Sequence, residues 1–510
     1  MTDPQHLSRP RPWGRFVLLA IAASLVGLST RVIPRVFPVA ARAVRKVMPI
    51  PQDTAKIETR RREFQEWTRR TVREAYDKVG KQDLRWNEQA HEALELATRL
   101  FSQQVDPEVS LIDVHTPAKA AIAAGCDDPY LVYLDHRSSV GPHDPGEQEM
   151  IRRMKVAARG LAASRYPAFR RAMALQVAGT YGLISNAAGA RKEAERDFDA
   201  SLALLPESIA EDERNEFWEA RWFENLSSLI AGYRGLDIAA PAAYERVDAK
   251  LAQIPELTVL RLQLRGYFWF HYGWEARTQA FAPNVPVGGF DTFEKHLEVA
   301  QKALNEAWKL RPDARTAEYL LEIEKGIGGD RDTMELWFDR ALTADGDQYN
   351  ACFTKLDWLD PKWHGTAEEM LAFGRACRAT KNWRAGITLL SGDAHLRYYS
   401  KLSPWQQARY LGSPKVWPEI KSVYDEYLMH RPSDDLTRSK YAVLGYLAGR
   451  YPEAHAQFEE LGDRLTAWPT FPYYPLETMK GMRSKTAAIV ASKPRPEQPP
   501  IRKPDGPALQ

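Results

Sequence analysis

Apolar side chains recur every three to five residues along most of this chain. Between Thr54 and Lys81, the residues Phe64, Trp67, Val72 and Tyr76 follow one another at such spacings. This period places their side chains on one face of a helix, and the charged residues between them on the other face. The stretch therefore predicts an amphipathic helix.

The same period continues through the rest of the chain. A second helix is expected over roughly Leu84–Phe101, and almost all that follows reads as helices joined by short turns. We find no convincing run of alternating β-branched residues of the kind that strands show. The pattern predicts an all-α chain, and an all-α chain of 510 residues invites a search for internal repeats.

Two segments share one register of small and aromatic residues. In each, a turn glycine precedes an alanine by five residues, and a phenylalanine follows four residues later. Glycine suits a tight turn between antiparallel helices, alanine lets two helices approach closely, and the aromatic ring lies on the same helix face as the alanine. The copies are Gly182, Gly189, Ala194 and Phe198, and Gly449, Ala454 and Phe458.

Weaker copies of this register recur 34 or 35 residues apart. The small or apolar position repeats from 300 to 334 and from 420 to 454, and the copies include Ala300, Ala307, Phe338 and Ala341. Helix pairs with a period of 34 residues are typical of tetratricopeptide repeats. The segments from about Val177 to Pro206 and from Leu257 to Arg464 resemble such repeats. The resemblance implies a tetratricopeptide-like, right-handed α-solenoid of helix pairs.

The motif Pro361-Lys362-Trp363-His364-Gly365-Thr366 falls where the register is stretched, between positions 334 and 385. It resembles the Pro-Lys-Trp-x-Gly-Ser/Thr signature of a bacterial family of unknown function, and this resemblance implies architecture without a known activity. We interpret the motif as a turn, with Trp363 as a packing anchor and Thr366 as the cap of a following helix. The alternative is a small functional site formed by Lys362 and His364.

The segment "YFWFHYGWE", residues 267–275, is unusually rich in aromatic residues. Not all of its rings can face inward from one helix, and exposed aromatic residues are good anchors for a partner. Core packing is the alternative for most of them. We therefore predict a scaffold or adaptor protein that binds a protein or peptide partner. The candidate partner-binding residues are Trp269, His271, Trp274, Lys362 and His364.

No motif predicts catalysis, a cofactor or a metal. "HEALE", starting at His91, has Glu95 where a zinc protease needs its second histidine, and the phosphate-binding and nucleophile-elbow motifs do not occur. The alternative function is an enzyme of unknown class, for example a hydrolase. Its site would lie at the repeat interruption around residues 359–366 or in the polar loop 135–144, which we otherwise interpret as a connector.

The N-terminus carries the one long apolar segment. Residues 16–30 have no charge, and Trp13–Thr30 is just long enough to span a bilayer. This predicts a single-pass membrane anchor. A cleaved signal peptide and a buried or surface helix are the alternatives. The basic residues that follow the span favour a cytoplasmic location for the rest of the chain.

The net charge and the cysteine content exclude some functions without indicating one. A net charge of +3 is too balanced to suggest nucleic acid binding, and three widely spaced cysteines suggest neither disulfides nor a zinc site. The predicted organisation is an anchor and basic flank at 1–50, an amphipathic helical connector at 51–110, a tetratricopeptide-like repeat domain at 111–482 and a disordered proline-rich tail at 483–510.

Overall fold

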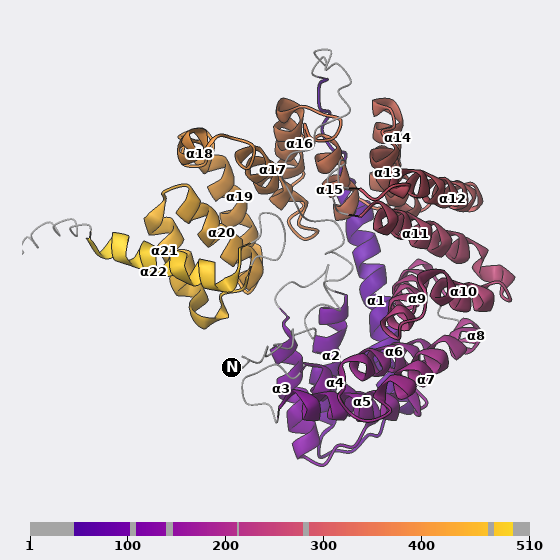
Figure 1. The fold of residues 1–510 in the computed structure, drawn as a ribbon. Helices are drawn as coiled ribbons and strands as arrows, with labels where there is room; N and C mark the ends of the chain where they lie inside the picture. The colour runs from indigo at the N-terminus through magenta and orange to yellow at the C-terminus, as the bar shows by residue number, and fades with distance from the viewer. Residues whose placement is uncertain are drawn as a thin grey trace, which may run out of the picture. The chain divides into compact units, whose positions relative to one another are not determined.

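The computed structural model describes residues 45–102, 109–138, 146–211, 214–278, 285–467 and 474–492. All regular elements in these ranges are helices, which confirms the all-α prediction (Figure 1). None of the described helices is both long and apolar enough to cross a membrane, and the predicted span at 13–30 lies outside the described residues.

Most of the predicted proline-rich tail at 483–510 also lies outside the described residues. Its first residues, 483–492, belong to a helix instead, because they contain no proline or glycine.

The helices fall into two compact units, one up to Ala394 and one from His395. The repeat register contains no sign of this boundary. The first unit contains α1 Thr54–Val79, α2 Asn87–Phe101, α3 Leu111–Ala123, α4 Pro129–Ser138, α5 Glu147–Ala162, α6 Ala168–Ile184, α7 Ala190–Ala203, α8 Leu205–Ala210, α9 Glu216–Gly235, α10 Ala240–Leu251, α11 Thr258–Arg277, α12 Gly289–Leu310, α13 Ala314–Ile327, α14 Arg331–Ala344, α15 Tyr349–Trp358 and α16 Ala367–Ala379.

The second unit is smaller. It contains α18 Pro404–Tyr410, α19 Trp417–His430, α20 Asp435–Leu447, α21 Tyr451–Leu461 and α22 Leu476–Ser492, and the boundary itself falls within α17 Leu390–Tyr399. Gly449 has a φ of 68° between α20 and α21, a left-handed conformation that glycine adopts without strain. Ala454 and Phe458 of α21 are fully buried. The repeat register therefore describes the α20–α21 hairpin correctly.

In the first unit, consecutive helices pack against each other as antiparallel pairs. In addition, α6 packs against α9, α9 against α11, α11 against α13 and α13 against α15. The first helices of successive pairs thus pack against one another in one layer. Six alanines and phenylalanines of the predicted register in this unit are buried, whereas Ala385, which fits the register loosely, is half-buried. The six buried residues are Ala194, Phe198, Ala300, Ala307, Phe338 and Ala341.

Helix α1 lies on the inner side of this curved stack (Figure 1). Its aromatic face is buried as the sequence predicts: Trp67 belongs to a hydrophobic core with α6 and α9, whereas Val72 and Tyr76 belong to a second core with α2 to α6. One helix therefore takes part in two hydrophobic cores of the described part of the unit. The segment predicted as a connector helix is an integral part of the packed structure.

Phe198 of α7 shows why small residues are required in this register. Its ring lies between Gly179 of α6 and Gly232 of α9, and a Cβ at either glycine would come within 2.3 Å or 2.5 Å of a ring carbon. A Cβ at Gly182 would likewise lie 2.8 Å from the Cβ of Ala194. The helices are close enough that only glycine fits at these positions.

We expect Phe198→Ala to lower the free energy of unfolding by about 3–5 kcal/mol, because it leaves a cavity between three helices. Phe290→Ala is the matched control, since its side chain is exposed; it should change the free energy by about 0.5 kcal/mol or less. Urea denaturation followed by circular dichroism measures both. Equal losses in the two variants would contradict the packing role of Phe198.

Candidate binding surface

The aromatic segment of α11 divides its side chains between the core and a partly exposed face. Phe268 and Phe270 are buried, whereas Trp269, His271 and Trp274 are half-buried. This mixed arrangement agrees with the prediction that the rings of one helix cannot all face inward.

An aromatic row crosses the first helices of three successive pairs. The ring of Tyr267 on α11 lies 5.3 Å from Phe223 on α9 and 5.6 Å from Tyr319 on α13, both edge to face. His271 joins this row, because its ring lies 4.4 Å from Tyr267 and 6.1 Å from Tyr319. Arg315 stacks over Phe223 at 4.2 Å. Side chains from three helices thus form one continuous aromatic cluster, in which Phe223 is buried and Tyr267, His271 and Tyr319 are half-buried.

The other predicted side chains lie around Trp363. Its ring is 6.3 Å from Trp274 of α11 and 6.3 Å from His364. Lys362 stands next to it, with Nζ 5.9 Å from the ring centre. The fold therefore brings Trp274, Lys362 and His364 together although they are almost ninety residues apart in the chain. Trp269 does not join them, because it packs against His296 of α12.

The turn that carries Trp363 has the local structure that its sequence predicts. Helix α15 ends at Trp358, and a Cβ at Gly365 would lie 2.2 Å from the backbone oxygen of Leu359, so only glycine fits the bend. Thr366 caps α16 and forms a reciprocal capping box with Glu369. His364 also has a structural contact, since its Nε2 lies 3.2 Å from the backbone oxygen of Lys325.

A buried group of charges lies beneath this turn. Lys325 of α13 is fully buried, and its Nζ lies 2.8 Å from Glu322 and 3.1 Å from Asp357 of α15. Thr354 donates a further hydrogen bond to Glu322. Lys362, which is half-exposed, lies 3.5 Å from the other oxygen of Asp357. Burial alone would lower the pKa of Lys325, but Glu322 and Asp357 outweigh it and raise the pKa.

The ionisable groups of the aromatic row are mostly uncharged near neutral pH. Burial lowers the pKa of His271 to about 4, so its ring is neutral. Burial, together with the charge of Glu322, raises the pKa of Glu318 to about 8, so this carboxyl group keeps its proton. Burial also raises the pKa of Tyr319 well above its usual value. His271, Glu318 and Tyr319 are therefore uncharged, whereas Arg315, which stacks over Phe223, brings a positive charge to the row.

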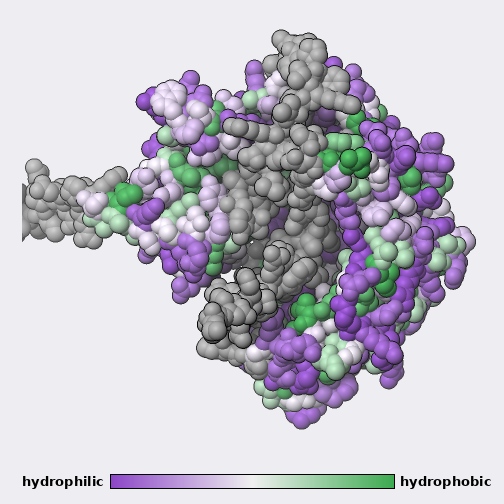
Figure 2. Space-filling view, in the orientation of Figure 1, coloured by the Kyte–Doolittle hydropathy of each residue, from purple (hydrophilic) through white to green (hydrophobic). Residues whose placement is uncertain are grey.

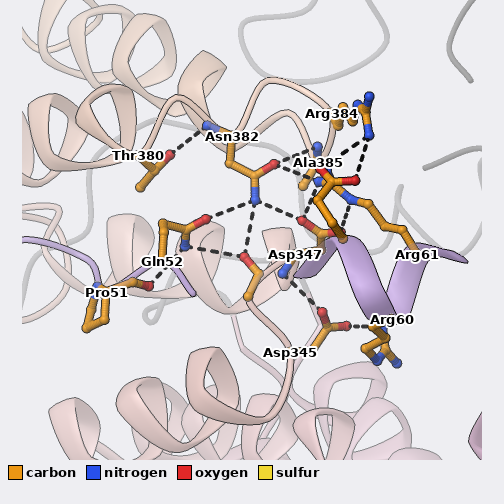
Figure 3. Close-up of polar contacts among 12 residues, drawn as sticks. Pro51, Gln52, Arg60, Arg61, Asp345, Asp347, Thr380, Asn382, Arg384 and Ala385 are labelled. Atoms are coloured by element: carbon orange, nitrogen blue, oxygen red, sulfur yellow. Dashed lines mark hydrogen bonds and ion pairs between the residues drawn. The ribbon is translucent and has the colours of Figure 1, made fainter. Parts of the chain in front are cut away.

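The N-terminal part of α1 is fixed at the far end of the unit by a second buried network (Figure 3). Arg61 donates two hydrogen bonds of 2.7 Å to the two carboxylate oxygens of Asp347, which lies between α14 and α15. Asn382, after α16, accepts from Arg61 at 3.1 Å and donates to Asp347 at 2.8 Å. The side chains of these three residues are all more than nine-tenths buried. We call them the Arg61 network.

Several important residues carry no sequence signal that we could use. Arg61 and Asp347 are ordinary helix and turn residues until the fold brings them together, and the same holds for Lys325 and Asp357. One sequence feature could have indicated such a residue. It is an acidic or basic side chain at a position that the helical period assigns to the core. Lys325 has this property, because it follows buried Leu321 by four residues.

The two enzyme alternatives gain no support from the described geometry. Lys362 and His364 are engaged by Asp357 and by a backbone oxygen. In the loop 135–144, residues 139–144 lie outside the described ranges. Asp135 is described, and its carboxylate lies 3.2 Å from His115. Within the described ranges, no group of three or more histidine, cysteine or acidic side chains has the geometry of a metal site.

We expect Lys325→Met to lower the free energy of unfolding by about 3–5 kcal/mol, because it leaves Glu322 and Asp357 buried without their cation. Lys362→Met is the matched control. It removes the half-exposed lysine that faces the same aspartate and should cost less than about 1 kcal/mol. Urea denaturation at neutral pH compares the two variants, and similar losses would show that the buried charge group is unimportant for stability.

The pKa of Glu318 predicts a specific pH dependence. A carboxyl group with a folded pKa of about 8, against an ordinary value of 4.5, favours folding fully only below pH 4.5. That contribution is lost as the pH rises towards 8, because the unfolded chain ionises while the folded protein must keep the proton. Glu318→Gln should therefore match the wild-type melting temperature near pH 4.5 and exceed it increasingly up to pH 8. A difference that does not change with pH would contradict the raised pKa.

Comparisons with known proteins do not assign this chain to a family. No family model matches the chain, and a search of the curated proteins finds no match either. The resemblance to tetratricopeptide repeats and to the Pro-Lys-Trp-x-Gly-Ser/Thr signature therefore rests on the motifs and their spacing alone.

Proposed function

We propose that this protein is a tetratricopeptide-like, right-handed α-solenoid that binds a protein or peptide partner, with no catalytic activity. The observation that supports this is the partly exposed aromatic surface of α11, α13 and the turn 361–366. Half-buried aromatic side chains on a rigid helical support lose little freedom when they bind. Such residues supply much of the binding energy at protein interfaces.

The partner that fits this surface is a peptide segment with an apolar or aromatic anchor. His271, Glu318 and Tyr319 present little charge near neutral pH. Burial of an apolar side chain against these three residues therefore desolvates no ion, as long as it leaves Arg315 exposed. Lys362 lies at the edge of the surface, where it is half-exposed and can pair with an acidic residue of the partner.

The face shown in Figure 2 is mostly hydrophilic, with hydrophobic residues in small separate patches. Large apolar patches are typical of permanent interfaces, whereas small aromatic surfaces within polar surroundings suit reversible binding. This supports an adaptor or scaffold that exchanges its partner. We further propose that residues 13–30 anchor the protein in a membrane and that its helical units lie on the cytoplasmic side.

Partner capture tests the proposal. Full-length protein carrying an affinity tag is purified from its own cells, and proteins bound to the wild type are identified by mass spectrometry. His271→Ala combined with Trp274→Ala should reduce the captured partner at least about tenfold, as expected for hot-spot residues. Trp405→Ala is the matched control, because this tryptophan is exposed in the other unit.

Circular dichroism must show that all variants remain folded. Capture of the same proteins by the wild type and by the double variant would contradict the proposed surface. A wild type that captures nothing above background would contradict the proposed function itself.

A further inference from the structure

A second unusual charge lies far along the unit from the aromatic surface, in the first turn of α6. Arg170 is only 8% exposed. Its Nη2 donates one hydrogen bond of 2.6 Å to the hydroxyl of Thr71 on α1, and its Nε is buried with no hydrogen-bond partner. None of the described carboxylates forms an ion pair with it. A buried guanidinium group normally has an anionic partner, because its desolvation is costly.

The surroundings of Arg170 supply aromatic rings in place of a counter-ion. Its guanidinium carbon lies 5.6 Å from the ring centre of Trp67, 5.4 Å from that of Phe169 and 5.9 Å from that of Phe101. Cation–π contacts of this kind contribute a few kcal/mol at most, about 2 kcal/mol for a desolvated contact. They also leave donor groups of the guanidinium unused. The rings hold the group in place without neutralising it.

Two further features make the region electropositive. Arg170 is the third residue of α6, where the helix dipole already favours negative charge. Arg221 of α9 contacts the backbone of Phe101, whose ring lies against Arg170, since its Nη2 donates to the backbone oxygen of Phe101 at 2.9 Å. Arg221 has its own partner in Glu224. Burial lowers the pKa of Arg170, and the charge of Arg221 acts in the same direction.

We propose that Arg170, assisted by Arg221, binds an oxyanionic group of a small ligand, a carboxylate or a phosphate. The planar fork of an arginine matches both groups, and both would supply the negative charge that the described surroundings of Arg170 lack. The site shares no residue with the proposed partner surface, although both include residues of α9.

Thermal unfolding of the full-length protein tests the site with three probes, namely inorganic phosphate, acetate and chloride at equal ionic strength. Phosphate or acetate should raise the melting temperature of the wild type in a saturable way, whereas chloride should not. The response to the two oxyanions identifies which one is preferred. Arg170→Met should abolish the response, and Arg171→Met is the matched control that retains it, because Arg171 pairs with Glu207 instead.

The variant also separates a binding role from a structural one. If Arg170 serves to bind a ligand, the Arg170→Met variant in chloride should melt at the same temperature as the wild type or higher, because the substitution removes a buried unpaired charge. Arg221→Met provides a second test should Arg170→Met fail to fold. It should weaken oxyanion binding about tenfold, as the loss of one charged contact does. Absence of a saturable oxyanion effect in the wild type, or an unchanged effect in the methionine variants, would overturn the proposal.

Discussion

The bidentate ion pair between Arg61 and Asp347 is the contact on which the attachment of the start of α1 to the later helices of the first unit depends. It joins residues 286 positions apart in the sequence, and both side chains are withdrawn from water. Asn382 adds a hydrogen bond to each partner, and Nη1 of Arg61 donates to Glu58, so the buried charges are well hydrogen-bonded. An ion pair of this kind does little for stability by itself, but it admits very few alternative arrangements of the helices around it.

Helix α1, which carries Arg61, also packs against many other helices of the unit. One of its faces fills the space between α6 and α9 with Trp67, and its later turns complete the core with α2 to α6. The stacked helix pairs thus enclose a helix of their own chain. The aromatic row of α9, α11 and α13 remains partly exposed beside it. A curved stack with one stretch of its inner side occupied has a shorter and better-defined surface for a partner than an open stack would have.

Local features of this fold could be predicted from the sequence, because they depend on neighbours in the chain. The positions of Ala194 and Phe198 follow from helical period and size, and the capping role of Thr366 follows from the residues on either side of it. Trp363 and Trp274 could be proposed separately but not as neighbours. The ion pairs of Arg61 and Lys325, and the unpaired state of Arg170, depend on tertiary contacts and burial. No spacing rule in a single sequence reveals them.

The position of α1 also has a consequence for the order of events during synthesis. The residues of this helix emerge from the ribosome early, whereas Asn382 follows Arg61 by 321 residues. At roughly 5–20 residues per second, tens of seconds separate the two. Throughout that interval Arg61 has only part of its final hydrogen-bonding environment. The helix at the centre of the unit is thus among the first elements to be made and among the last to complete its contacts.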